Sequence, residues 1–299
     1  MTDSGQGFAA WTAEVQACVE QTLDALLPAA AEPQELYQAM RYATLDGGKR
    51  VRPLLAFAAG NLFSAPSAPL ARAAAAVEMI HAYSLVHDDM PCMDDDALRR
   101  GKPTVHVKFG EAPALLVGDA LQTRAFEILA EESTDVEPAR RLEMIRTLAQ
   151  AAGAGGMCGG QAIDLASVGR SLSLEQLERM HQLKTGALLR ASVWLGALCG
   201  GRLDAQCRAA LDAYAAAIGL AFQVVDDVLD ATADSVTLGK TAGKDAADNK
   251  PTYVSILGLD ASRELAQRLR ADAHAALQPF GAAAQRLREL ADLIVQRNA

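Results

Sequence analysis

The chain has 299 residues, of which 51% are apolar and only 5% aromatic, and its net charge is −9. Alanine and leucine dominate, which favours helix over sheet. The acidic balance and the absence of any run of lysine and arginine argue against nucleic acid as a main partner. The length is sufficient to bury a sizeable hydrophobic core.

The sequence predicts a soluble, cytoplasmic protein. The first residues show no basic segment followed by an apolar core, so we expect no secretory signal. The longest apolar stretches, such as 187–201, are interrupted by Arg190 or glycine and are too short to span a membrane. The five cysteines are odd in number and show no CxxC spacing, which is typical of reduced thiols in the cytosol.

Helical periodicity covers most of the chain, and strand-like alternation is nearly absent. Breakers such as SAPSAP at 64–69 and EESTDVEP at 131–138 separate the helical segments. Helices are expected at roughly 8–27, 34–45, 51–63, 69–90, 112–131, 137–154, 174–199, 204–230, 260–276 and 280–297. No linker is long enough to demand a second domain. We therefore predict one all-α domain over 1–299, a bundle of long helices.

The first chemically informative segment contains Asp88, Asp89 and Asp94 and follows the apolar approach MIHAYSLV. Pro91 must distort the helix, which lets Asp94 return toward Asp88. Carboxylates in an apolar context are costly unless they face a strong partner, and Mg²⁺ takes one or two carboxylates plus phosphate oxygens and water. The segment therefore predicts a magnesium site, with a solvated acidic helix end as the alternative.

A second acidic cluster, Asp226, Asp227 and Asp230, follows the apolar stretch AAAIGLAFQVV. Asp226 and Asp230 are four residues apart and share a helix face. Like charges at that spacing repel each other unless a cation lies between them. The cluster predicts a second metal site, again with a helix end as the alternative.

Basic residues lie in three places: the GGKRVRP segment at 47–53, the RRGK segment at 99–102, and Lys184 within an apolar helix. Arginine forks bind phosphate oxygens with two bonds, and a loop that enters a helix offers free N–H groups to anions. Together with two metal sites, these cations predict a site for two polyanions. Taken singly, each of these basic groups would more often be a solvent-exposed group without a binding role.

His81 lies two helical turns before Asp88 and should share its face. A ligand-binding histidine and a satisfied core histidine are both compatible with this position. The glycine-rich stretch 152–161 follows no strand and fits no phosphate-binding motif, so nucleotide binding is not expected.

These motifs resemble the trans-isoprenyl diphosphate synthases, and the bacterial farnesyl diphosphate synthases in particular. The match runs from about residue 36 to 260, through GGKRVRP, EMIHAYSLVHDDMPCMDDDALRRGKPTVH, GMCGGQAIDL, KTGALL, and FQVVDDVLD with LGK. Five motifs in order are far more specific than a lone DDxxD. The resemblance implies an all-α bundle around a deep central cavity, and a homodimer.

The resemblance also implies an activity: a magnesium-dependent head-to-tail prenyltransferase. It would condense isopentenyl diphosphate with dimethylallyl or geranyl diphosphate to give farnesyl diphosphate, by ionisation, condensation and elimination. Asp88, Asp94, Lys184 and Asp226 would be catalytic. Three Mg²⁺ ions per site are implied, held by Asp88 and Asp94 with Asp89 nearby, and by Asp226 with Asp230 and Asp227.

The resemblance assigns the remaining site residues to two diphosphates. The allylic substrate would contact Arg99, Lys184, Thr185, Gln223, Lys240 and Lys250. Isopentenyl diphosphate would contact Gly48, Lys49, Arg52, His81 and Arg100. Gln161 and Asp164 would line the cavity and order the lysine and the metals.

Product length is predicted from Tyr83, with Ser84 beside it. Tyr83 lies five residues before Asp88, about 7.5 Å along a helix axis. A ring there would form the floor of the cavity and favour farnesyl diphosphate, although it could equally be an ordinary core aromatic.

Other activities stay open. The nearest are a geranylgeranyl or geranyl diphosphate synthase. A class I terpene cyclase would usually have Ser or Thr where Asp230 stands and would have no obvious use for GGKRVRP. A non-catalytic partner subunit would tend to lose one acidic cluster.

Overall fold

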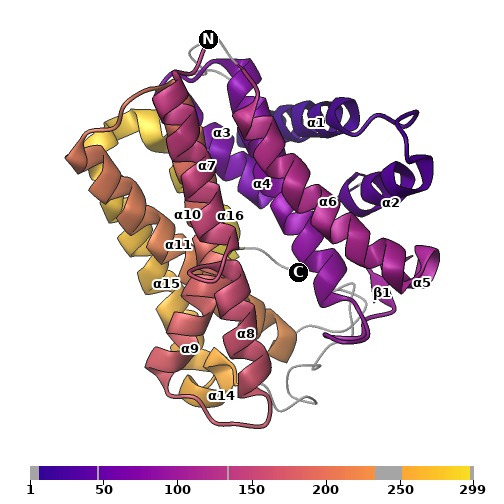
Figure 1. Ribbon diagram of the computed structural model, residues 1–299. Helices are drawn as coiled ribbons and strands as arrows, with labels where there is room; N and C mark the ends of the chain where they lie inside the picture. Colours follow the sequence, from indigo (N-terminus) through magenta and orange to yellow (C-terminus); the bar gives the residue numbers. More distant parts are fainter. Residues whose placement is uncertain (1–6, 46, 133–134, 233–250, 297–299) are drawn as a thin grey trace. The chain divides into compact units, whose positions relative to one another are not determined.

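The structure is a computed structural model that describes residues 7–45, 47–132, 135–232 and 251–296 (Figure 1). Within these ranges there are only two strands, each two residues long. Helices make up nearly all of the secondary structure described. The predicted all-α class is confirmed. The chain divides into two compact units, Met1–Arg146 with Leu195–Arg202, and Thr147–Trp194 with Leu203–Ala299. A single domain over 1–299 stays a prediction.

The first unit is built around one central helix. Its elements are α1 (Phe8–Leu26), α2 (Gln34–Thr44), α3 (Val51–Leu62), α4 (Ser67–Asp88), β1 (Leu98–Arg99), β2 (Lys102–Pro103), α5 (Val105–Phe109) and α6 (Glu111–Ala130). Helix α4 contacts α1, α2, α3 and α6. A helix that is apolar on all sides is expected to be buried, and Val77, Met79 and Ile80 of α4 have no exposed surface.

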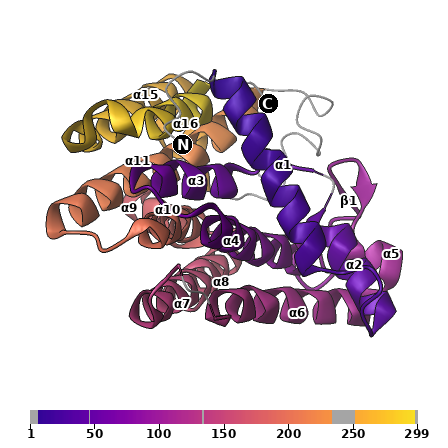
Figure 2. The ribbon, with the colours of Figure 1, turned by 90° about the horizontal axis from the view of Figure 1, so that it is seen from above.

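Helices α4 and α6 run side by side in both views (Figures 1 and 2). Gly118 of α6 permits this approach, because a Cβ atom there would lie 1.9 Å from Nε2 of His87. The same Nε2 lies 3.1 Å from the carbonyl oxygen of Leu115. The carboxyl end of α4 is therefore fixed against α6 one residue before Asp88.

A small hairpin follows α4. Strands β1 and β2 are antiparallel, with Arg99 opposite Lys102 and Leu98 opposite Pro103. The two loop residues, Arg100 and Gly101, have φ of 53° and 74°. Positive φ at both central residues is typical of the type I′ turn, whose twist matches that of the strands.

The second unit is also organised around a central helix, α11 (Ala205–Thr232), which contacts α9, η1, α14, α15 and α16. The other elements are α8 (Met157–Ser167), α9 (Leu174–His181), the π-helix η1 (Gln182–Gly186), α14 (Tyr253–Leu257), α15 (Leu259–Ala276), the 3-10 helix η2 (Gln278–Ala284) and α16 (Gln285–Gln296). Helices α7 (Pro138–Ala152) and α10 (Ala187–Gly200) contribute residues to both units.

Helix α11 is the one described helix that is long and apolar enough to cross a membrane by length and composition. More than half of its most apolar stretch, 56%, is buried inside the protein. The core helix of a soluble protein passes the same test, so this finding is weak evidence for a membrane span.

Several element boundaries differ from the sequence prediction. The predicted helix 174–199 is three segments, α9, η1 and α10. Half of the glycine-rich stretch 152–161 belongs to α8, which was not predicted, and neither were α5, α14 and the hairpin. Glycine disfavours helix by propensity, but tertiary packing overrides propensity where a close approach requires it. A Cβ atom on Gly160 would lie 2.1 Å from the backbone nitrogen of Lys184.

Candidate active site

The first acidic cluster lies in a tight turn at the end of α4. The N–H of Asp94 donates to the carbonyl of Asp88 at 2.8 Å, so the chain returns as the position of Pro91 predicted. Both aspartates are half-buried. The carboxyl end of a helix carries partial negative charge, which disfavours further carboxylates there. The location therefore favours a bound cation.

Asp89 faces inward, with only 3% of its surface exposed. Its two carboxylate oxygens accept from Nε of Arg99 at 2.9 Å each, and one also accepts from Nη2 at 2.5 Å. Burial raises the pKa of Asp89, and the Arg99 guanidinium opposes that rise. Asp89 thus orients Arg99, a role that the sequence did not indicate.

Arg50 is the inward-facing member of the three cations in GGKRVRP. It precedes α3 in a left-handed conformation with φ of 49°. Its guanidinium donates to Glu78 at 2.6 Å, to Glu20, and to the carbonyl of Thr44 at 2.7 Å. The buried ion pair of Arg50 with Glu78 compensates the unfavourable left-handed backbone conformation of Arg50. Arg50 is therefore a structural residue that fixes the loop.

Several arginines of this unit lie close enough to His81 to act on its charge. The Arg100 guanidinium lies over Gly48, since a Cβ atom there would be 2.7 Å from Nη1. His81 is half-buried, and burial together with the charges of Arg52, Arg100 and Arg99 lowers its pKa well below 6.5. These arginine charges disfavour a proton on the imidazole, and they indicate a positive potential that suits an anion.

The predicted chain-length residues lie on the same helix. Tyr83 is 5% exposed, and its ring meets the edge of His87 with 5.8 Å between centroids. The hydroxyl of Ser84 donates to the carbonyl of His81 at 2.8 Å. Central helix α4 thus carries, in order, His81, Tyr83 and the acidic turn.

Lys184 is held in the second unit by a carboxylate. Its Nζ donates to Asp164 of α8 at 2.5 Å, which agrees with the expectation that Asp164 orders this lysine. Lys184 lies in the π-helix η1, and π-turns inside longer helices are frequent at functional sites. Gly219 lets α11 approach this turn, because its Cβ atom would lie 3.0 Å from Cα of Gly186.

A chain of hydrogen bonds joins η1 to the second acidic cluster. Thr185 donates to Oε1 of Gln223 at 3.3 Å, and Nε2 of Gln223 donates to Asp227 at 3.1 Å. The other oxygen of Asp227 accepts from the backbone N–H of Tyr253 at 2.7 Å. Asp227 is buried and bound on both oxygens. Asp226 and Asp230, four residues apart, are left as the metal-binding candidates of this cluster.

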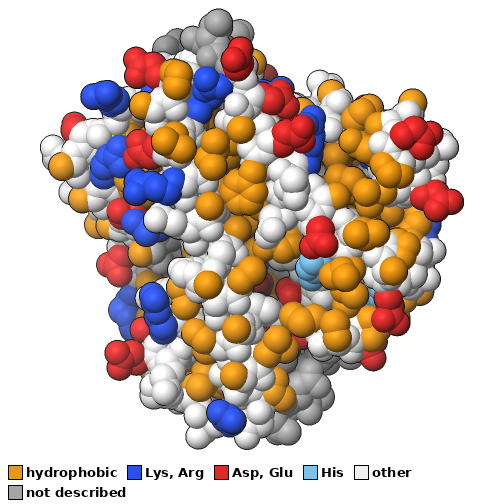
Figure 3. Space-filling view, viewed as in Figure 1, with side chains coloured by type: hydrophobic (Ala, Val, Ile, Leu, Met, Phe, Trp, Pro, Cys, Tyr) orange, Lys and Arg blue, Asp and Glu red, His pale blue; other side chains and the backbone are white. Residues whose placement is uncertain are grey.

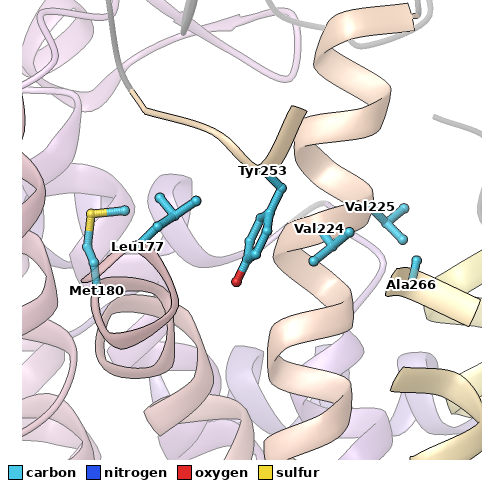
Figure 4. Packing of buried hydrophobic residues seen from close by; sticks show 6 residues of the cluster. All are labelled: Leu177, Met180, Val224, Val225, Tyr253 and Ala266. Carbon is cyan, nitrogen blue, oxygen red and sulfur yellow. The ribbon is translucent and has the colours of Figure 1, made fainter. Parts of the chain in front are cut away.

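His181 was missed by sequence reasoning. It is buried, and its ring stacks on Tyr253 with 5.6 Å between centroids. Burial is the main reason why its pKa is lowered to about 4, and Lys184 adds to the effect. Figure 4 shows the Tyr253 ring between Leu177 and Met180 on one side and Val224 on the other. Helical spacing offered a signal, because Leu177, Met180 and His181 lie at i, i+3 and i+4 and share the buried face of α9.

Three other predicted site residues are Lys240, Lys250 and Gln161. Lys240 and Lys250 lie outside the described residues. Gln161 of α8 is half-buried, and its buried Nε2 has no hydrogen-bond partner within the described part of the chain.

Known proteins resemble this chain in sequence and in fold. Residues 33–284 match the family model described as Polyprenyl synthetase. The chain is 55% identical to a probable farnesyl diphosphate synthase of Sinorhizobium fredii, over 91% of this chain and 82% of that protein. It is 49% identical to the farnesyl diphosphate synthase of Escherichia coli, over 95% and 98%. An FPP/GFPP synthase structure from Zymomonas mobilis superposes with a TM-score of 0.87 at 45% identity, covering 96% and 98%.

Proposed function

The chain belongs to the polyprenyl synthetase family, and we propose that it condenses isopentenyl diphosphate with dimethylallyl or geranyl diphosphate to give farnesyl diphosphate. It is a prenyltransferase of the farnesyl diphosphate synthase type. One observation carries the proposal: each unit's central helix ends in carboxylates and has cations in the same unit. These cations are Arg99 and Arg100 for α4, and Lys184 for α11.

The donor chemistry of the acidic clusters fits Mg²⁺. Within the described residues no three His, Cys, Asp or Glu side chains are grouped closely enough to hold a metal. Mg²⁺ is usually bound by one or two carboxylates and completes its shell with water and substrate phosphates. We assign Asp88 and Asp94 of the first unit, and Asp226 and Asp230 of the second, as Mg²⁺ ligands, with three ions in total. When bound, the metal neutralises charge on the diphosphate leaving group.

The cations of each unit would bind the diphosphates. Arg99 and Arg100 lie in the hairpin, and a planar guanidinium can donate two bonds to phosphate oxygens. The residues proposed for isopentenyl diphosphate are Gly48, Lys49, Arg52, His81 and Arg100. Those proposed for the allylic diphosphate are Arg99, Lys184, Thr185 and Gln223, with Lys240 and Lys250.

The reaction needs no protein nucleophile. The allylic C–O bond breaks, and diphosphate leaves with the electron pair while the protein's cations stabilise its charge. The isopentenyl double bond then forms the new C–C bond, and the departed diphosphate accepts a proton from the adjacent carbon, which restores a double bond. The allylic cation needs surroundings that exclude water, because water would convert it to an alcohol.

The assay is incubation of the purified protein with Mg²⁺, isopentenyl diphosphate and geranyl diphosphate, with products identified by mass spectrometry. A fifteen-carbon diphosphate is expected, and chelation of the metal should abolish it. A twenty-carbon product would replace the farnesyl assignment with a geranylgeranyl one. A cyclic hydrocarbon or no elongation would contradict the transferase function.

Tyr83→Ala is expected to lengthen the main product from fifteen to twenty carbons. Removal of a buried ring five residues before Asp88 opens space along α4, about 7.5 Å from the acidic turn. Product chain lengths from geranyl diphosphate are compared by mass spectrometry with those of Tyr37→Ala, which changes a tyrosine elsewhere. An unchanged length in Tyr83→Ala would rule out the floor role.

We also propose that the protein is a cytoplasmic homodimer. Val107 of α5 and Leu115 and Leu116 of α6 are about half exposed, although large apolar side chains are usually buried. Figure 3 shows hydrophobic side chains gathered over this part of the first unit. Leu116→Asp is expected to shift the mass measured by light scattering toward the monomer, while Leu293→Asp on α16 should not. Equal masses for both variants would exclude this face as the interface.

A further inference from the structure

The hairpin that carries Arg99 and Arg100 is too small to hold its own shape. Each strand has two residues, and isolated hairpins are marginally stable in water. Side chains from outside must therefore fix it. On β1, Asp89 binds the Arg99 guanidinium with three hydrogen bonds.

Tyr42 of α2 supports the other strand. Its hydroxyl donates to the carbonyl of Pro103 at 2.7 Å, across 61 positions of sequence. Pro103 is paired with Leu98 in the hairpin, and the next residue, Thr104, donates to the carbonyl of Ala97 at 3.0 Å. The Tyr42 hydroxyl thus contacts the hairpin at its base, next to the bond that closes it.

The ring of Tyr42 is independently fixed. Phe109 meets it edge-on with 5.4 Å between centroids, and Nζ of Lys108 lies 3.7 Å from its centroid. Tyr42 also lines a cavity of about 100 Å³ together with Asp89, Arg99 and Arg100. Loss of the hydroxyl alone would leave these ring contacts in place and remove only the bond to the hairpin.

The two arginines differ in their other support. Arg99 keeps its fork on Asp89, whereas Arg100 lies over Gly48 and makes no hydrogen bond or ion pair with a side chain among the described residues. Arg100 also occupies a left-handed turn position, with φ of 53°. The position of the Arg100 side chain therefore depends on the hairpin more strongly than the position of the Arg99 side chain does.

We propose that Tyr42 is a positioning residue that holds the hairpin so that Arg100 meets isopentenyl diphosphate. This inference rests on the proposed function for the identity of the ligand. Tyr42→Phe is expected to raise KM for isopentenyl diphosphate about fivefold, the effect of one neutral hydrogen bond. KM for geranyl diphosphate should change less than about twofold, because Arg99 keeps its own partner.

Tyr37→Phe is the matched control. It makes the same change on the same helix, and its hydroxyl makes no hydrogen bond within the described part of the protein. Steady-state kinetics are measured for both variants with each substrate varied in turn. Equal KM values for isopentenyl diphosphate in the two variants, or an equal rise in both KM values of Tyr42→Phe, would overturn the inference.

Hydrogen exchange separates this inference from the proposed function. Amides in 96–104 are expected to exchange faster in Tyr42→Phe than in Tyr37→Phe, whatever the enzyme's activity. Unchanged exchange in this segment would show that Tyr42 does not hold the hairpin. If the wild-type protein forms no prenyl diphosphate, the proposed function fails, and the exchange result alone then decides whether Tyr42 supports the hairpin.

Discussion

Replacement of Asp88 by asparagine is expected to lower kcat for farnesyl diphosphate formation by about three orders of magnitude. The substitution keeps the size of the side chain and removes the charge that would bind Mg²⁺ at the end of α4. Without that charge, the negative diphosphate leaving group loses part of its neutralisation. The measurement is kcat at saturating substrates, with the Mg²⁺ concentration varied.

Asp95→Asn is the matched control for this change. Asp95 is exposed in the same turn and has φ of 51°, a conformation that asparagine also tolerates. We expect kcat within about twofold of the wild-type value, as for a surface substitution. If kcat of Asp88→Asn is as close to the wild-type value as that of Asp95→Asn, Asp88 is not a metal ligand and the alternative of a solvated helix end is correct.

Glu78→Gln is expected to lower the free energy of unfolding by about 3 kcal/mol. Glu78 is buried on α4, and its carboxylate accepts from Arg50 at 2.6 Å. Neutralising one partner of a buried ion pair leaves the other charge only partly compensated. Glu20 and the carbonyl of Thr44 still contact Arg50, which places the loss at the lower end of the usual range.

Urea unfolding followed by circular dichroism measures this loss. Glu14→Gln, an exposed position on α1, provides the comparison and should stay within about 0.5 kcal/mol of the wild type. A Glu78→Gln protein as stable as Glu14→Gln would mean that the buried pair contributes no net stability.

Much of the fold could be predicted because the long helices follow a clear 3.6-residue period. The acidic turn could also be predicted in part, since a proline at position 91 cannot continue α4. Elements that depend on distant partners could not. Helix α8 contains glycines that propensity alone would exclude, and its existence depends on the close approach to Lys184.

The site was predictable in residue type but not in the direction of each side chain. Asp89 binds Arg99 one residue after Asp88, and Asp227 binds the backbone of Tyr253 one residue after Asp226. Identical neighbours differ in role because helix geometry points them at different surroundings. Only the tertiary partners decide which carboxylate faces inward, and a single sequence does not record them.

The surroundings of His81 link ligand binding to proton uptake. In the folded protein, burial and the arginines lower the pKa of the His81 imidazole and keep it neutral. Below about pH 6.5 the unfolded chain therefore binds one more proton than the folded one, and the free energy of unfolding decreases as the pH decreases. A diphosphate bound among these arginines, as proposed, would offset their charge and raise the pKa of His81. Binding in mild acid would then take up part of a proton, which calorimetry in buffers of different ionisation enthalpy would detect. Acid would thus destabilise the empty fold more than the occupied one through a single imidazole.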